Sequence, residues 1–260
     1  MSNISEIKAM SFNLRLDGDY DGENTFFKRT DLVLDAIRRA DPDIIGFQEV
    51  RPRMRKWIRE NLKNYTIQGC GRGRVFDDES TTIAYRTDKF ELVSLENIWL
   101  SNTPDVPGST YGGDQSPCPR MFTSALLCHL ESGKWFRFVN THLDHVGNNA
   151  RVLGAAQIMQ HIELKKYNFI LTGDFNAEPG SPEIELITST EINGRRVTDC
   201  TAGIGGTFHD FGRLPEEKRS KIDYIFTDMT CVASSVVEDP HENGRYYSDH
   251  NAVTSVIALQ

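Results

Sequence analysis

Five apolar segments of strand character in this chain each adjoin a cluster of acid, amide or imidazole side chains. The clusters are Ser-Phe-Asn (11–13), Gly-Phe-Gln-Glu-Val (46–50), Asn-Thr-His-Leu-Asp-His (140–145), Gly-Asp-Phe-Asn (173–176) and Ser-Asp-His (248–250). Catalytic groups are commonly carried where a strand of a rigid sheet ends. One such cluster alone is more often a turn or a surface feature. Five together favour a single site built from several strand ends.

The spacing of apolar residues predicts both strands and helices. Strands are expected over 7–14, 43–47, 81–85, 90–99, 122–130, 135–141, 168–172, 222–226 and 252–259, and helices over 30–40, around 54–62 and over 149–166. A hairpin turn at 131–134 joins two of the strands, and residues 101–120 form a long loop rich in proline and glycine, which is typical of a functional or mobile segment. This mixture predicts an α/β fold, a four-layer α/β sandwich of two packed mixed β-sheets flanked by helices.

Composition narrows the class of protein. The 260 residues contain no linker-like stretch, which predicts a single domain over 1–260, and no apolar run approaches the roughly 18 residues of a membrane span. Residues 1–6 lack a basic region followed by an apolar one, so a cytoplasmic location is expected. The five cysteines are widely spaced without a Cys-x-x-Cys pair, which disfavours both a disulfide framework and a structural zinc site.

The net charge of -8 indicates which kinds of molecule the protein can bind. Proteins that bind nucleic acid through general electrostatics usually present a basic face, so tight non-specific duplex binding is disfavoured. Acidic residues around a bound cation would account for part of the excess negative charge.

Oxygen ligands occur among the strand-end clusters. Glu49 and Asp249 supply carboxylates and Asn13 supplies an amide oxygen, a set that suits Mg²⁺ or Mn²⁺. A hard divalent cation offsets the charge on a phosphate ester and on its leaving alkoxide. These residues therefore indicate metal-assisted hydrolysis of phosphate esters.

The other clusters supply acid–base groups for that reaction. Asp174 is expected to deprotonate the attacking water, and Asn176, two residues on, to fix the orientation of that water. His142 and His250 are expected to hydrogen-bond the phosphoryl oxygens or the leaving group. An imidazole used in this way needs its second nitrogen held, and Asp223 is the candidate partner of His250.

The motifs Ser-Phe-Asn, Gln-Glu-Val, Asn-Thr-His, Gly-Asp-Phe-Asn, Ile-Asp-Tyr and Ser-Asp-His, in this order, resemble those of the endonuclease/exonuclease/phosphatase superfamily. The resemblance extends over about residues 7–259. This superfamily includes deoxyribonucleases, abasic-site endonucleases, deadenylases, inositol polyphosphate 5-phosphatases and neutral sphingomyelinases. The resemblance implies the same roles for the residues named above, with Asn13, Glu49 and Asp249 at the metal, Asp174 as the base, Asn176 and His142 on the phosphate, and Asp223 supporting His250.

Two further segments, residues 24–29 and 119–120, resemble a poorly characterised bacterial branch of the superfamily. That resemblance implies that Asn24, Arg29 and Arg120 contact the substrate. His145 and Arg151 are expected to line the same cleft. Arg72 and Arg74 are interpreted as solvent-facing charges, although their position between glycines would let them reach a substrate phosphate.

The sequence thus predicts a metal-dependent phosphoric ester hydrolase that uses Mg²⁺, with Mn²⁺ as the alternative. A phosphodiesterase acting by Asp-activated water attack on phosphorus is favoured. The substrate class stays open, but the acidic charge favours a small-molecule or lipid-linked phosphate ester over nucleic acid, and no protein partner is expected. A nuclease acting on DNA or RNA is the alternative within this class.

Rival functions fit the sequence less well. A catalytically silent binding module would be marked by loss of the base or of a metal carboxylate, and Glu49, Asp174 and Asp249 are all present. A zinc hydrolase of the metallo-β-lactamase type would have a histidine at the start of the motif at 140–145, and this chain has Asn140 there. A calcineurin-like phosphoesterase would need an aspartate after Gly-Asp to bridge its two metals. In this chain Asn176 and an alanine follow Gly-Asp-Phe, so that aspartate is missing.

Overall fold

The computed structural model describes residues 5–260, and within them the chain forms two six-stranded β-sheets. The first sheet contains, in spatial order, β13 (Thr230–Val236), β14 (Val253–Ala258), β1 (Glu6–Asn13), β2 (Ile44–Gln48), β4 (Ile83–Arg86) and β3 (Tyr65–Gln68). The second contains β11 (Thr198–Asp199), β12 (Asp223–Thr227), β8 (Phe169–Asp174), β7 (Trp135–His142), β6 (Met121–His129) and β5 (Phe90–Trp99). Both sheets are mixed, because β1 and β2 pair in parallel, as do β7 and β8, while the other neighbours are antiparallel.

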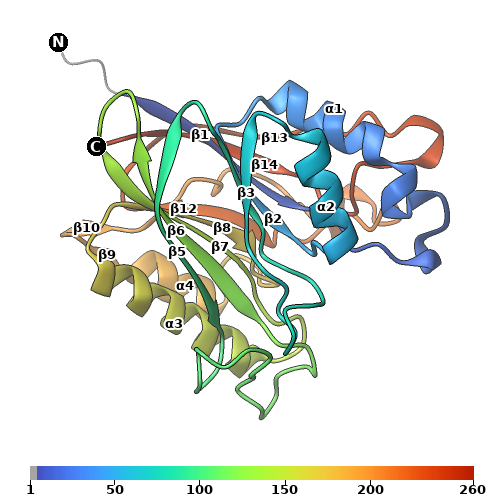
Figure 1. The fold of residues 1–260 in the computed structure, drawn as a ribbon. Coiled ribbons are helices and arrows are strands. Elements are labelled where there is room, and N and C mark those ends of the chain that lie inside the picture. The colour runs from blue at the N-terminus through green and yellow to red at the C-terminus, as the bar shows by residue number, and fades with distance from the viewer. Residues whose placement is uncertain (1–4) are drawn as a thin grey trace.

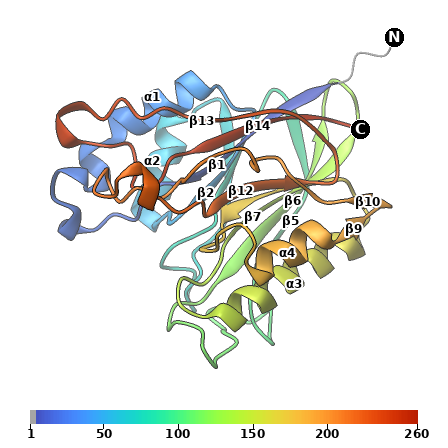
Figure 2. The same cartoon turned by 180° about the vertical axis from the view of Figure 1, so that it is seen from behind.

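The helices lie outside the two sheets, and this arrangement gives four layers. In Figures 1 and 2, α1 (Thr30–Ala40) and α2 (Pro52–Asn61) cover the first sheet, whereas α3 (Asn148–Lys165) and α4 (Pro182–Ser189) cover the second. A short hairpin of β9 (Glu191–Ile192) and β10 (Arg195–Arg196) follows α4. Single 3₁₀ turns occupy Asp19–Asn24, Phe26–Lys28, Glu216–Lys218 and Glu242–Gly244. The predicted four-layer α/β sandwich is confirmed.

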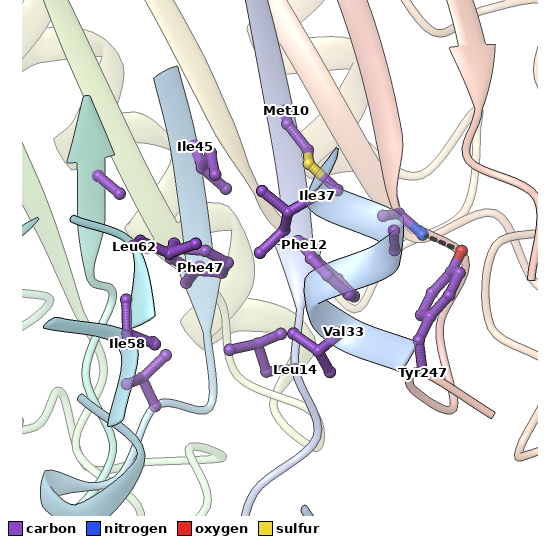
Figure 3. Packing of buried hydrophobic residues seen from close by; sticks show 14 of the residues in the cluster. Met10, Phe12, Leu14, Val33, Ile37, Ile45, Phe47, Ile58, Leu62 and Tyr247 are labelled. Atoms are coloured by element: carbon purple, nitrogen blue, oxygen red, sulfur yellow. Dashed lines mark hydrogen bonds between the residues drawn. The ribbon is translucent and has the colours of Figure 1, made fainter. Parts of the chain in front are cut away.

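Three clusters of buried apolar side chains hold the layers together. The first lies between the first sheet and its helices, where Phe12 and Phe47 pack against Val33 and Ile37 (Figure 3). Within this cluster the backbone N–H of Ala252 donates a hydrogen bond of 3.0 Å to the buried hydroxyl of Tyr247. The second cluster joins the second sheet to α3 and α4, and the third fills the space between the two sheets. Each sheet is therefore covered on both faces.

Strand β1 shows how this packing leads to a site. Its side chains alternate, with Met10 and Phe12 in the cluster against the helices and Ala9 in the cluster between the sheets. Ser11 and Asn13 follow Ala9 on the inner face and are buried. The inner face of the strand thus changes from apolar to polar toward its C-terminal end.

Most of the predicted elements are present, and two of them, at 30–40 and 90–99, have the observed bounds. Residues 101–120 contain no helix or strand, as predicted for a long loop. The sequence analysis missed edge strands β3 and β13, helix α4 and the short strands β9 to β11. Strand β13 is mostly exposed and lacks apolar alternation, and β3 spans only four residues, so neither gives a clear periodic signal.

No helix within residues 5–260 is both long and apolar enough to cross a membrane. Residues 1–4 lie outside the described residues. Part of the expectation about the N-terminal segment, and the first residues of the predicted domain, fall on them.

Candidate active site

Side chains from both sheets meet at one edge, where β1, β2, β7 and β8 end. Antiparallel β12 begins there, and its Asp223 pairs in register with Asp174 at the end of β8. On the other side of β8, His142 at the end of β7 pairs in register with the same Asp174. Sheet register therefore places three of the predicted site residues side by side.

A buried polar network joins the two sheets just below this edge. The Asn140 side chain donates to the carbonyl oxygen of Phe47 at 2.8 Å and accepts from Gln48 at 2.7 Å and from the Thr172 hydroxyl at 3.1 Å. A Cβ atom at Gly46 would lie 2.1 Å from the Thr172 hydroxyl oxygen and 2.4 Å from Oδ1 of Asn140. Glycine at this position is therefore needed for the close approach of the sheets.

A cavity of about 580 Å³ opens above the network. It is lined by Arg15, Leu16, Glu49, Arg72, Glu79, Cys118, Arg120, His142, His145, Asp174, Asn176, Glu178, Phe208, Ser220, Ile222, Asp249 and His250. Eight of the thirteen predicted site residues are in this set. Glu49 and Asp249, which are 200 positions apart in the sequence, thus line the same cavity as the sequence analysis expected.

Asn13 lies between two carboxylates of the site. Its amide nitrogen donates to Glu49 Oε1 at 3.1 Å and to Asp174 Oδ2 at 2.9 Å. Its oxygen accepts the backbone N–H of Arg15 at 2.9 Å. In this structure the amide oxygen accepts a backbone bond and the nitrogen faces the carboxylates, so the role of Asn13 as an oxygen ligand of the metal stays a prediction.

The carboxylate of Glu49 is held in the ionised form. Burial raises its pKa, but the Arg15 guanidinium, the backbone N–H of Leu16, His250 and Asn13 together lower the pKa below its usual value. The Leu16 N–H bond to Glu49 Oε2 measures 2.8 Å. Glu49 also has a positive φ of 61°, which turns the chain at the end of β2. A half-buried, ionised carboxylate that faces the cavity suits a cation ligand.

Asp174 is buried at the centre of the site. Burial raises the pKa of its carboxyl to about 7; His250 acts against this shift, and the nearby carboxylate of Asp223 adds to it. The backbone N–H of Asn176 donates to Asp174 Oδ1 at 2.9 Å. The side chain of Asn176 donates to the Leu143 carbonyl at 3.1 Å, and Asn176 has a positive φ of 48°. Asn176 is thus fixed beside Asp174 and faces the cavity.

His250 is paired with Asp223, as expected. Nδ1 of His250 lies 2.8 Å from Asp223 Oδ2, and Nε2 lies 3.8 Å from Asp174 Oδ2. Burial lowers the pKa of His250, but the carboxylates of Asp223, Asp174 and Asp249 more than offset burial and raise the pKa to about 10. The ring of Phe208 packs against the imidazole at a centroid distance of 5.0 Å. His250 is therefore a protonated, fully positioned donor.

His142 has the opposite protonation state. Burial, together with the positive charges of Arg120 and Arg72, holds the pKa of His142 well below its usual range. Its Nε2 lies 3.5 Å from Asp174 Oδ2. The two histidines on either side of Asp174 thus differ, with one neutral and the other charged.

The residues at this edge fit a divalent cation. Ligand atoms of Glu49, His142 and Asp174 all lie within 4.8 Å of one another. Burial raises the pKa of Asp249, and the adjacent charge of Glu49 raises it further. Carboxylates that repel one another in this way are stabilised by a bound cation.

The five residues predicted to bind substrate divide into two groups. Arg120 and His145 line the cavity, with Nη2 of Arg120 at 2.8 Å from Nδ1 of His145. Nε and Nη1 of Arg120 are buried and have no hydrogen-bond partner within the described part of the chain. These two residues lie where the prediction requires.

The other three lie away from the cavity wall. Arg29 is completely buried and donates only to backbone carbonyl oxygens, so the prediction that it contacts substrate is wrong. Asn24 bonds the backbone of Tyr246 and Gly244. Arg151 bonds Glu183 and the carbonyl of Asp144, and so connects α3 to α4. Each is a structural contact.

Sequence reasoning missed several residues of the cavity wall. Arg15, Glu79 and Phe208 were given no role, and Arg72 is buried against Glu79 at 3.0 Å, whereas a solvent-facing charge was predicted. A weak signal existed for Arg15, which stands two residues after Asn13. The others lie on irregular loops, whose course the periodic pattern does not give.

Comparison with known proteins defines the class. A model of the Endonuclease/Exonuclease/phosphatase family matches residues 10–250. The chain therefore belongs to this family, and it is a phosphoester hydrolase by family and by structural neighbours.

Particular relatives support this assignment. An endonuclease/exonuclease/phosphatase from Bacteroides vulgatus has a TM-score of 0.91 and 32% identity, and the match covers 98% of this chain and all of the other. A mannosyl-6-phosphatase from Bacteroides thetaiotaomicron has a TM-score of 0.86 and 29% identity, covering 96% and 98% of the two chains. An uncharacterized protein of Acanthamoeba polyphaga mimivirus is 30% identical over 230 residues, which is 83% of each chain.

Proposed function

We propose that this protein is a divalent-metal-dependent hydrolase of small phosphate esters in which Asp174 activates the attacking water. The observation that carries the proposal is the position of Asp174, buried between Asn13, neutral His142 and protonated His250 on the wall of the cavity. A base, two imidazoles and a set of carboxylates in one cavity match the needs of phosphoester hydrolysis.

The metal would be held by Glu49 and Asp249. When bound, Mg²⁺ or Mn²⁺ supplies positive charge for the phosphoryl oxygens and the leaving group. The fit rests on the ionised state of Glu49, on its place among possible ligand atoms with His142 and Asp174, and on the position of Asp249 in the same cavity.

The protein's own residues perform the remaining steps. Asp174 accepts a proton from water, and Asn176 holds that water in line with phosphorus. His250 donates a hydrogen bond to a phosphoryl oxygen or to the leaving oxygen, and Asp223 fixes its orientation. His142, which stays neutral, adds a second hydrogen bond to the phosphoryl group.

For the substrate, we propose a small-molecule ester. The net charge of -8 disfavours a long polyanion, and the cavity is of the size that a small ligand fills. A phosphodiester was favoured from the sequence. Two observations make a sugar phosphomonoester a second candidate: the similarity to a mannosyl-6-phosphatase and the three arginines of the cavity wall. A phosphomonoester dianion carries one more negative charge than a diester, and arginines pair with that charge.

A substrate screen tests this proposal. Purified protein with Mg²⁺ or Mn²⁺ is assayed on bis-p-nitrophenyl phosphate, p-nitrophenyl phosphate, mannose 6-phosphate, glucose 6-phosphate and single-stranded DNA. We expect metal-dependent turnover of one of the small esters that is abolished by EDTA. Turnover of DNA alone, falling steeply with salt, would support the nuclease instead. No turnover of any ester would support the silent binding module.

A further inference from the structure

Arg15 follows the polar end of β1, and its charge helps to keep Glu49 ionised. Its guanidinium lines the cavity, with Nε at 3.6 Å from Oδ2 of Asp249. Asp21 holds the group from behind, with Nε at 3.1 Å and Nη2 at 3.2 Å from its two carboxylate oxygens. The side chain of Arg15 is 27% exposed. The guanidinium is thus fixed in orientation while it remains within reach of a molecule in the cavity.

The backbone at Arg15 is left-handed, with φ of 52°. A residue other than glycine is unfavourable in this conformation and persists there only where its surroundings enforce it. Here the N–H of Arg15 donates to Asn13 Oδ1 at 2.9 Å, and the N–H of Leu16 donates to Glu49 Oε2 at 2.8 Å. The turn that aims Arg15 is therefore held by Glu49, a proposed metal ligand, and by Asn13, which donates a hydrogen bond to Glu49.

Arg29 fixes the carbonyl side of the same turn. Its Nη2 donates to the carbonyl oxygens of Leu14 at 2.6 Å and Arg15 at 2.9 Å, and its Nε donates to that of Asn24 at 2.7 Å. A fully buried guanidinium requires such bonds, because an unpaired buried charge is strongly unfavourable. This explains the burial of Arg29, which otherwise contributes no group to the cavity.

Donor groups of Arg15 remain free. Within residues 5–260, Nη1 forms no hydrogen bond, and Nη2 uses one of its two N–H groups on Asp21. The 3.6 Å separation from Asp249 is an ion pair without a hydrogen bond. A guanidinium with free donors in parallel orientation matches the oxygens of a phosphoryl group.

We propose that Arg15 contacts the phosphoryl group of the substrate, and that Asp21 and Arg29 are positioning residues for it. This inference rests on the proposed function and deepens it, because it assigns a phosphate ligand to the part of the cavity wall beside Asp249. The competing explanation is that Arg15 only neutralises Glu49 and Asp249. The two explanations predict opposite effects on metal and phosphate binding.

The test measures both ligands by direct binding. Inorganic phosphate is titrated in the presence of Mg²⁺ by calorimetry, and Mn²⁺ is titrated by electron paramagnetic resonance. The variants are Arg15→Gln, Arg15→Lys and Asp21→Asn. Arg53→Gln is the matched control, because Arg53 is 80% exposed and does not line the cavity; it lies 3.8 Å from Asp17 and 4.9 Å from the centre of the Phe27 ring.

We expect Arg15→Gln to weaken phosphate binding by about tenfold or more, as for loss of a charged hydrogen bond, with little change in Mn²⁺ affinity. Arg15→Lys should recover part of the loss, Asp21→Asn should lie between wild type and Arg15→Gln, and Arg53→Gln should match wild type. Unchanged phosphate binding in Arg15→Gln, or tighter Mn²⁺ binding with unchanged phosphate binding, would overturn the proposal, as would no phosphate binding by wild type.

The binding readout separates this inference from the proposed function. If wild type hydrolyses no ester but phosphate binding still depends on Arg15, the hydrolase assignment fails and the phosphate site stands. If esters are hydrolysed and Arg15→Gln turns over normally with normal phosphate affinity, the assignment stands and Arg15 is excluded as a phosphate ligand.

Discussion

Nδ1 of His250 lies 2.8 Å from Oδ2 of Asp223, although His250 precedes a strand of the first sheet and Asp223 begins a strand of the second. His250 follows directly on the Ser-Asp pair that precedes β14, and Asp223 begins β12. The pair therefore fixes the relative position of the sheets at the mouth of the site and keeps the imidazole charged.

Asp223→Asn is expected to lower the pKa of His250 from about 10, because the principal attractive charge is removed. A raised pKa keeps the imidazole protonated up to alkaline pH. In the variant the proton is lost at lower pH, so the alkaline limb of the kcat profile should move to lower pH. We also expect kcat to fall by at least about tenfold. NMR titration of the His250 ring against the exposed control Asp105→Asn measures the shift, and an unchanged titration would contradict the coupling.

Glu49→Gln is expected to weaken metal binding. An amide keeps the shape of the side chain but removes the charge that attracts a divalent cation. The Mg²⁺ concentration for half-maximal rate should rise by about tenfold or more. Glu178→Gln is the matched control, because Glu178 also lines the cavity but is exposed. Equal metal titrations of the two variants and wild type would remove Glu49 from the ligand set.

Gly46→Ala is expected to destabilise the fold. The new Cβ would overlap the Thr172 hydroxyl and Oδ1 of Asn140, whose nearest atoms lie 2.1 and 2.4 Å away. Overpacking of this kind typically costs about 1–3 kcal/mol. Urea unfolding compares the variant with Gly203→Ala, where a Cβ meets nothing within 4 Å. Equal unfolding free energies for the two variants would show that the sheets separate without cost.

The strand ends were predictable because apolar runs covered on both faces are distinctive in sequence. The apolar run 169–171 comes just before Thr172, Gly173 and Asp174, so these residues were expected at the C-terminal end of the strand. The pairing of Asp223 with His250 followed from motif order. The identity of the substrate and the cellular location stay predictions.

The parts that were not predictable depend on loops. Arg72, Glu79 and Phe208 reach the cavity on irregular segments, whose path is set by tertiary contacts such as the backbone bond from Arg72 to Glu79 at 2.8 Å. Arg29 was wrongly expected to contact the substrate. The sequence alone does not distinguish a buried arginine that donates to backbone carbonyl oxygens from one that binds phosphate. Asn13 likewise gave no sign of which amide atom faces the carboxylates.

Turnover by Asp174→Asn, measured with Mg²⁺ on the best ester from the substrate screen, tests the central assignment most directly. The amide retains the size of the side chain but cannot accept the proton of water, so kcat should fall at least about 100-fold, with thermal stability and Mn²⁺ binding close to wild type. Wild-type kcat in this variant would contradict the account.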